Sequence, residues 1–314
     1  MALGLRKKRN HPEPASRLIR FEAADGIELG GLLYEPARAA KDVLIWLHGT
    51  GGSSIFDSKR TNPLAAEIVR QGLAFFPFNN RGAHVMRRLA VRSGKRSSHV
   101  QGGAAFELIR ECVADIDGAI RELRARGYSR FHLAGHSTGA NKIVIYDQLK
   151  RRNPVASYLL VAGGDDTGMF YEQLGPRKFH ATLDRAKAMI KSRRGMELVP
   201  PAISDVPMSW CSFYDMANPD GEYNVFPFLE ALEDVKLSRK PPFWRLKTIR
   251  KPVLAIYGEN DEYLSDVSAA VSAMADAVGP RENFEFAIMR NADHSFTGRE
   301  ATLGALMATW ATSF

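Results

Sequence analysis

Residues 131–139 read Phe-His-Leu-Ala-Gly-His-Ser-Thr-Gly, an apolar run that ends in Gly-x-Ser-x-Gly. This pattern is typical of a strand that enters a sharp turn with a serine at its tip. The turn is tight, so the residues around the serine must be small, and Gly135 and Gly139 meet that need. The hydroxyl of Ser137 would then stand clear of the sheet edge. We predict that Ser137 is a nucleophile, which requires a histidine and an acid as partners.

Candidates for both partners follow the serine in the chain. Residues 251–258 form an apolar strand pattern that runs into an acidic loop containing Asp261. A further strand pattern, 284–290, is followed by His294. The order of serine, acid and histidine, each just after a strand, predicts a catalytic triad of Ser137, Asp261 and His294.

A turn rich in glycine follows the strand pattern 42–48. A backbone N–H from such a turn and the N–H of the residue after the nucleophile can together bind the oxyanion of a tetrahedral intermediate. We predict that Thr50 and Thr138 supply these two donors. Gly51 is the alternate to Thr50.

Strand and helix patterns alternate along most of the chain, which predicts an α/β fold. The near-continuous apolar runs suit strands that are covered on both faces, so we expect a mostly parallel central sheet with helices on both sides. The expected strands are 17–22, 27–34, 42–48, 73–78, 131–136, 157–162, 251–258 and 284–290. The expected helices are 60–72, 104–126, 138–151 and 299–314, and the segment 81–99 is expected to be a loop.

Regular alternation fails between residues 164 and 247, a stretch too long for a loop. It contains a basic helical part, 182–194, and a part rich in aromatic and turn residues. We predict a cap that is inserted into a core of residues 1–163 and 248–314. The aromatic side chains of this cap either form its own small core or line the substrate site.

Composition limits the remaining possibilities. The chain has 314 residues, and its apolar and charged fractions are those of a globular protein. No stretch approaches the roughly 18 apolar residues of a transmembrane helix. The basic start of the chain is not followed by the apolar region of a secretory signal. Two cysteines, Cys112 and Cys211, are too few for a disulfide framework. We expect a cytoplasmic protein that does not bind membranes.

The formal net charge is +8, and the basic residues gather in three clusters, at 6–9, 81–96 and 177–194. We find no nucleic-acid-binding motif beside them and expect no nucleic-acid partner. The clusters are either a solvated surface or a positive field that attracts an anionic substrate. The solvated surface is the simpler interpretation. The segment 81–99 is the reason to consider the second one, because it follows the carboxyl end of a strand, where such sheets bind ligands.

The whole chain resembles the α/β-hydrolase superfamily. Within it, the motifs at 135–139, 260–263 and 291–294 are similar to those of the siderophore-esterase-like group, and so is the cap segment 207–221. That group includes fungal enzymes that hydrolyse the ester bonds of hydroxamate siderophores. The segment Asn79-Asn-Arg-Gly-Ala-His84 looks more like bacterial relatives.

The resemblance implies an α/β-hydrolase fold with Ser137 as nucleophile, Asp261 as acid and His294 as base. Some members of the superfamily place the acid after an earlier strand, which makes Asp165 and Asp166 the alternative candidates here. The predicted reaction is the hydrolysis of a small carboxylic ester through an acyl-enzyme, with no metal or organic cofactor. An acyltransferase or thioesterase with the same triad is the alternative, and a non-catalytic binding protein is less favoured. The sequence leaves a homodimer open.

Overall fold

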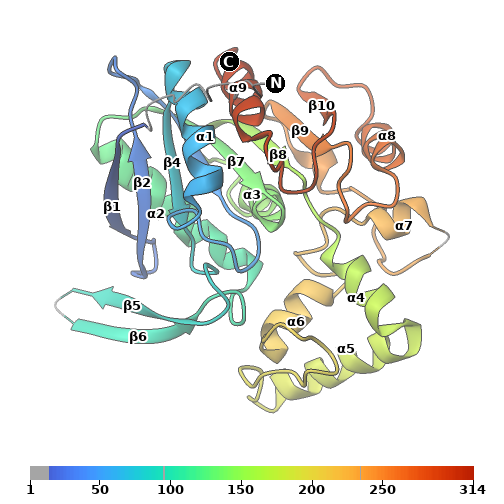
Figure 1. The fold of residues 1–314 in the computed structure, drawn as a ribbon. Coiled ribbons are helices and arrows are strands. Elements are labelled where there is room, and N and C mark those ends of the chain that lie inside the picture. Colours follow the sequence, from blue (N-terminus) through green and yellow to red (C-terminus); the bar gives the residue numbers. More distant parts are fainter. Residues whose placement is uncertain (1–13, 95, 234) are drawn as a thin grey trace, which may run out of the picture.

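The computed structural model describes residues 14–94, 96–233 and 235–314, which form a layered α/β structure (Figure 1). In this part of the chain, eight strands make one sheet in the order β1-β2-β4-β3-β7-β8-β9-β10. The strands from β4 onward run parallel, whereas β1 and β2 join antiparallel at one edge. The strands of the sheet are β1 (Ser16–Glu22), β2 (Glu28–Tyr34), β3 (Asp42–Leu47), β4 (Ala74–Asn79), β7 (Arg130–His136), β8 (Val155–Val161), β9 (Val253–Gly258) and β10 (Phe284–Met289). The predicted fold class is confirmed.

Helices cover both faces of the sheet, because both faces of its central strands are apolar. Side chains of β3 alternate between two clusters: Leu44 and Trp46 pack with the helices of one face, and Ile45 and Leu47 with those of the other. The first face carries α1 (Ser58–Arg70) and α9 (Glu300–Ala311), and the second carries α2 (Cys112–Ala125), α3 (Thr138–Leu149) and α8 (Val267–Val278). The described part of the chain contains no helix long and apolar enough to cross a membrane.

The segment expected to be a loop after β4 contains a separate hairpin. Strands β5 (Arg87–Ser93) and β6 (Arg96–Gly102) pair antiparallel, and Gly94 with φ 61° lies in the turn between them. The hairpin carries few apolar residues, and only one side of β5 is partly buried. The expectation of a loop was therefore wrong, because a solvated hairpin lacks the apolar run that marks a buried strand. The basic tail at 6–9 and Lys95 lie outside the described residues.

The helix expected over 104–126 begins later than predicted. A single turn of 3₁₀ helix, η1 (Ile109–Glu111), leads into α2. The amide of Ala105 donates to the carbonyl oxygen of Val85 at 2.9 Å, and the carbonyl of Ala105 accepts from Ser209 at 2.7 Å. The carbonyl of Ala105 is thus engaged with another part of the chain and is not free to accept a helical hydrogen bond at the predicted start of the helix.

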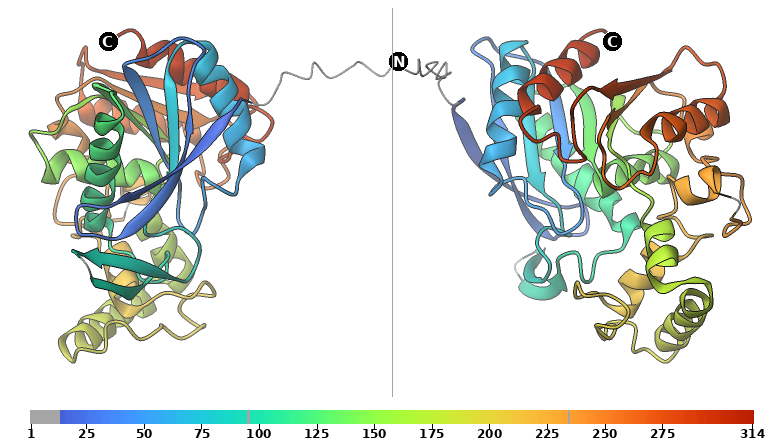
Figure 2. Two further views of the ribbon diagram at one scale, coloured as in Figure 1. Left: turned by 90° about the vertical axis from the view of Figure 1, so that its left-hand side faces the viewer. Right: turned by 45° about the vertical axis from the view of Figure 1, so that its right-hand side comes forward.

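The insertion between β8 and β9 contains α4 (Asp166–Leu174), α5 (Pro176–Lys191), α6 (Trp210–Ala217), α7 (Phe228–Leu232) and η2 (Leu246–Thr248). Figures 1 and 2 show α4, α5 and α6 beyond the end of the sheet at which β8 finishes. Trp210, Phe213 and Phe226 are buried in the same hydrophobic cluster as the sheet strands. The division into core and cap stays a prediction.

Candidate active site

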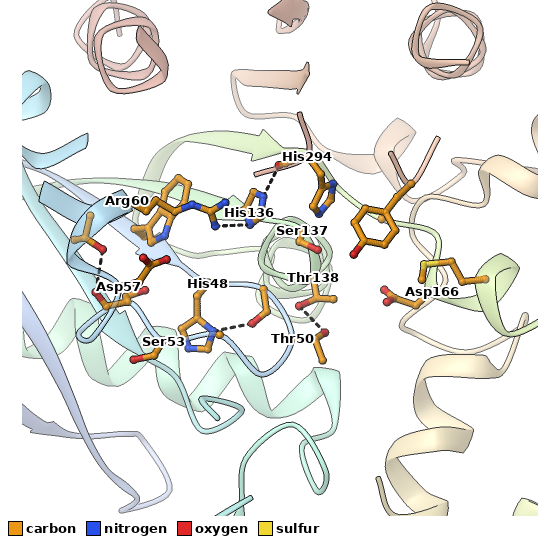
Figure 3. A pocket seen from close by; sticks show the side chains of 18 residues that line it. His48, Thr50, Ser53, Asp57, Arg60, His136, Ser137, Thr138, Asp166 and His294 are labelled. Atoms are coloured by element: carbon orange, nitrogen blue, oxygen red, sulfur yellow. Dashed lines mark hydrogen bonds between the residues drawn. The ribbon is translucent and has the colours of Figure 1, made fainter. Parts of the chain in front are cut away.

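Three of the predicted site residues follow the carboxyl ends of parallel strands. Ser137 comes after β7, Asp261 after β9 and His294 after β10. Parallel strands end at the same edge of a sheet, so these loops meet there. Ser137 and His294 line one cavity of about 290 Å³ (Figure 3). Asp261 is buried behind His294 and hydrogen-bonded to it.

Ser137 lies at the junction of β7 and α3 in a conformation that few non-glycine residues adopt. Its φ is 55° and its ψ is −127°. Its amide donates to the carbonyl oxygen of Val161 in β8 at 2.9 Å, and its carbonyl accepts from Ala140 at 2.8 Å. Such a conformation costs about 1–3 kcal/mol and persists only where the surroundings over-determine it. The strand, turn and helix predicted from Gly-x-Ser-x-Gly are present.

The two glycines of the motif are required by close backbone contacts. A Cβ atom at Gly139 would lie 2.4 Å from the carbonyl oxygen of Leu47, and one at Gly135 would lie 2.3 Å from the carbonyl oxygen of Gly139. Any side chain at either position would push α3 away from β3 or from β7.

His294 and Asp261 form the closest charged contact of the site. Nδ1 of His294 lies 3.0 Å from Oδ1 and 2.9 Å from Oδ2 of Asp261. Backbone bonds hold the two loops together: Asn260 donates to Ala292 at 2.8 Å, and the amide of His294 donates to Oε2 of Glu262 at 3.0 Å. A carboxylate accepts hydrogen bonds, so Nδ1 of the imidazole is the donor and Nε2 of the neutral ring is left to accept a proton.

The alternative acids occupy different positions. Asp165 caps α4: its Oδ1 accepts from Gly168 at 2.7 Å and its Oδ2 accepts from Leu229 at 2.8 Å. Both oxygens of Asp165 are therefore used within the fold. Asp166 lines the cavity, and its Oδ2 atom is buried without a hydrogen-bond partner among the described residues. His294 is hydrogen-bonded to Asp261 and to neither of these two carboxylates.

The residues predicted to bind the oxyanion lie together beside Ser137. Oγ1 of Thr50 donates to Oγ1 of Thr138 at 3.2 Å, which ties the loop after β3 to the start of α3. A Cβ atom at Gly49 would lie 2.9 Å from Cβ of Ser137, so this loop packs directly on the serine. Neither the amide of Thr50 nor that of Thr138 donates a hydrogen bond to another described residue. Both N–H groups are available to a ligand.

Two further residues, His136 and Arg60, support the histidine loop. Nε2 of His136 donates to the carbonyl oxygen of His294 at 2.8 Å, while Nη1 of Arg60 lies 3.3 Å from Nδ1 of His136. Nη2 of Arg60 also donates to the carbonyl oxygen of Ser295 at 2.6 Å. Burial and the neighbouring Arg60 charge hold the pKa of His136 well below its usual range, which fits a neutral ring. Arg60 comes from α1, and no motif around it in the sequence marks it.

His48 has a supporting role in the loop after β3. Its Nδ1 donates to the carbonyl oxygen of Gly49 at 2.8 Å, and the amide of Gly52 donates to the same oxygen at 3.2 Å. Burial, with the nearby Lys142 charge, lowers the pKa of His48 to about 3, so its ring is neutral near pH 7.

The insertion contributes Gly164, Asp166 and Met169 to the cavity wall. The buried aromatic residues of α6 and α7 do not line it. Of the two roles considered for these aromatic residues, packing within the hydrophobic core is the one that the structure supports.

The cavity brings together a serine hydroxyl and an imidazole whose other nitrogen is held by a carboxylate, the groups that transfer a proton in serine hydrolases. It can also stabilise a developing oxyanion with two unused backbone amides. These are the elements of acyl transfer through a covalent serine intermediate.

Comparison with known proteins identifies the family and the fold. A model of the Alpha/beta hydrolase family matches residues 44–303. No curated protein sequence matches the chain. Among solved structures, Est1E from Butyrivibrio proteoclasticus with bound ferulic acid has a TM-score of 0.61 at 13% identity, covering 93% of this chain and 98% of that one.

The esterase Pf2001 of Pyrococcus furiosus is similar over 96% of this chain and 93% of its own, with a TM-score of 0.53 and 14% identity. The esterase domain of a Rhodothermus marinus protein covers 95% of this chain and 98% of its own, with a TM-score of 0.53 and 16% identity. At such identities these likenesses concern the fold, whereas the family model spans most of the sequence. The chain belongs to the alpha/beta hydrolase family.

Proposed function

We propose that the protein is a serine hydrolase that cleaves a carboxylic ester through an acyl-enzyme intermediate. The observation that carries the proposal is the hydrogen bond of His294 to Asp261 in the loop that faces Ser137. Nδ1 is occupied by the carboxylate at 2.9 Å, and Ser137 lines the same cavity as the ring. Support also comes from the solved structures of similar fold, several of which are esterases.

In the first step, Oγ of Ser137 attacks the carbonyl carbon of the ester, and Nε2 of His294 takes the hydroxyl proton. The carbonyl oxygen becomes an oxyanion and accepts hydrogen bonds from the amides of Thr50 and Thr138. Asp261 keeps the imidazole in the required tautomer and offsets its positive charge. When the tetrahedral intermediate breaks down, the proton on Nε2 passes to the leaving alcohol.

In the second step, a water molecule gives its proton to His294 and attacks the acyl carbon. The new tetrahedral intermediate uses the same two amide donors. Its collapse breaks the bond to Oγ of Ser137, which regains the proton, and releases the carboxylic acid. The cycle conserves all charges and needs no group from outside the protein except water.

Covalent labelling tests the proposed nucleophile. A fluorophosphonate probe should label the wild-type protein, and the Ser137→Ala variant should lose this labelling with its fold intact. Ser53→Ala is a matched control, because Ser53 lines the same cavity while its hydroxyl bonds Asn79 at 3.2 Å. Equal labelling of wild type and Ser137→Ala would remove Ser137 as nucleophile.

Activity on 4-nitrophenyl esters of rising acyl length tests the reaction. We expect turnover by the wild type and a loss of about 10³–10⁶ in kcat for Ser137→Ala. The same assay with added alcohol acceptors, and with matched thioesters, separates a hydrolase from an acyltransferase or a thioesterase. A siderophore ester belongs in the panel, because the sequence motifs resemble that group. Wild-type protein that neither labels nor turns over any ester would leave a binding protein as the better interpretation.

A further inference from the structure

Asp166 is a charged residue of the cavity that the proposed reaction does not use. It is the first residue of α4, and its carboxylate is turned toward Thr50 and Thr138 (Figure 3). The atom Oδ2 is buried and has no hydrogen-bond partner among the described residues. A buried carboxylate oxygen without a donor is costly, so it is expected where a ligand supplies the donor.

The basic side chains near Asp166 are engaged with other carboxylates. Nζ of Lys142 lies 2.7 Å from Oε1 of Glu107, and the imidazole of His294 is bonded to Asp261. No ion pair to Asp166 is present in the part of the chain that the structure describes. The wall beside the oxyanion site thus carries a negative charge that lacks a counter-ion.

We propose that Asp166 binds an ammonium group of the substrate. The proposal rests on the proposed function and deepens it: the enzyme hydrolyses esters that carry a positively charged amine in the acyl or the alcohol part. An N–H donor with a positive charge suits this carboxylate, because it supplies a hydrogen bond to the unpartnered Oδ2 atom and a directly paired counter-ion. Charge-assisted hydrogen bonds of this kind are the stronger ones.

The charge state of Asp166 agrees with this role in mildly alkaline solution. Burial raises the pKa of Asp166 to about 6, while the charges of His294 and Lys142 and hydrogen bonds from its own amide and from the hydroxyl of Tyr223 act in the opposite direction. Above pH 7 the carboxylate is mainly ionised. The same carboxylate, together with burial, raises the pKa of the Tyr223 phenol, so that group remains a neutral neighbour.

The substrate proposed here is cationic, whereas the basic clusters of the sequence raised the possibility of an anionic substrate. Several of those basic residues are paired in the structure. Arg81 is buried and lies 2.7 Å from Asp115, and Arg92 lies 2.9 Å from Glu28. A panel of esters of different charge therefore distinguishes the two hypotheses.

The test uses matched 4-nitrophenyl esters at pH 8: 6-aminohexanoate, heptanoate, 6-hydroxyhexanoate and the adipate monoester. A second set places the charge on the alcohol side, with hexanoate esters of 5-aminopentanol and hexanol. In one of the two sets, kcat/KM of the wild type should favour the amino ester over its neutral isostere by about 10- to 100-fold, the range of a hydrogen bond to a charged group. The carboxylate ester should be the poorest substrate.

The Asp166→Asn variant should reduce the ratio of amino to neutral ester to about one. Asp57→Asn is the control, because Asp57 lines the same cavity on the side of Arg60, and it should keep the ratio. If the wild type does not prefer the amino ester in either set, the proposal is overturned, and no variant is needed for that conclusion. An unchanged ratio in a folded Asp166→Asn would also overturn it, and so would equal rates for the hydroxy and amino esters if the preference lies in the first set.

The two proposals fail in different ways. If the wild type hydrolyses the neutral esters but does not prefer amines, the inference about Asp166 is wrong and the hydrolase remains. If the wild type is neither labelled by the fluorophosphonate nor active on any ester of the panel, the proposed function itself fails.

Discussion

Nε2 of His136 and the carbonyl oxygen of His294 are joined by a hydrogen bond of 2.8 Å. The residue directly before the candidate nucleophile thus holds the backbone of the candidate base. Arg60 completes the connection, since it contacts Nδ1 of His136 at 3.3 Å and the carbonyl oxygen of Ser295 at 2.6 Å. Helix α1, the end of β7 and the loop after β10 are tied together at one point, which limits movement of the imidazole relative to Ser137.

The first prediction concerns Arg60. Arg60→Gln should lower kcat/KM for esters by about 10- to 100-fold, because a shift of about 1 Å in a catalytic group can cost that much. The loss should fall mainly on kcat. Arg70→Gln is the control: Arg70 is on the same helix, but its guanidinium is exposed and pairs with the neighbouring Glu67 at 2.6 Å. A folded Arg60→Gln with wild-type kcat would show that the contact does not position the base.

The second prediction identifies the acid. Asp261→Asn should lower kcat by about 10³–10⁴, because an amide can leave the imidazole in the wrong tautomer. Asp165→Asn should keep its activity and lose about 1 kcal/mol of stability, since an asparagine side chain can accept only one of the two bonds that Asp165 accepts from Gly168 and Leu229. Steady-state kinetics and urea unfolding of both variants provide the measurement. Full activity in Asp261→Asn and loss in Asp165→Asn would reverse the assignment.

The third prediction concerns the turn of the nucleophile. Gly139→Ala should destabilise the protein by roughly 1–3 kcal/mol or more, the cost of inserting an extra carbon into a packed region. The new Cβ would lie 2.4 Å from the carbonyl oxygen of Leu47, a backbone atom that cannot move without shifting β3. Gly164→Ala is the matched control, because a Cβ there would have no atom within 4 Å. Thermal unfolding of the two variants should differ clearly, and equal midpoints would contradict the packing argument.

Most strands of the sheet could be predicted from the sequence because they are buried on both faces. The pattern 42–48 corresponds to Asp42–Leu47, and 251–258 corresponds to Val253–Gly258. A continuous apolar run of this length between turn residues marks a central parallel strand. The hairpin β5–β6 lacked that signal, since its side chains are largely solvated.

Helix α8 was not among the expected helices, although a signal for it existed. Asp266 accepts a hydrogen bond from the amide of Ala269 at 2.9 Å and caps the helix. Aspartate before an apolar segment is typical of a helix start. The apolar segment Val267–Val278 is short and directly follows the acidic loop that contains Asp261. Its helical pattern was therefore not separated from that loop.

Some residues of the candidate site could likewise be predicted from the sequence, and others could not. Ser137, Asp261 and His294 could be selected because each follows a strand in a recognisable order. Arg60 could not, because it precedes His136 by 76 positions and the contact exists only in three dimensions. Asp166 was considered as a possible acid. Its position facing the cavity depends on the direction in which the chain runs from β8 into α4, and no local sequence pattern predicts that direction.

The last prediction uses a buried histidine away from the site. His132 lies in β7, its Nδ1 is 2.7 Å from Oγ of Ser157, and burial lowers its pKa from 6.5 to about 4. A depressed histidine pKa means that the unfolded chain binds the proton first, so stability is fully present above pH 6.5 and is lost as the pH falls toward 4. The full loss amounts to about 3 kcal/mol for a shift of this size.

His132→Asn removes the titration and keeps a polar partner for Ser157. The difference in unfolding free energy between wild type and variant should therefore move in favour of the variant by about 2–3 kcal/mol between pH 7 and pH 4.5. Urea unfolding at the two pH values measures this difference. A difference that stays constant with pH would mean that the ring of His132 takes up its proton as readily in the folded protein as in the unfolded chain, contrary to its burial in β7.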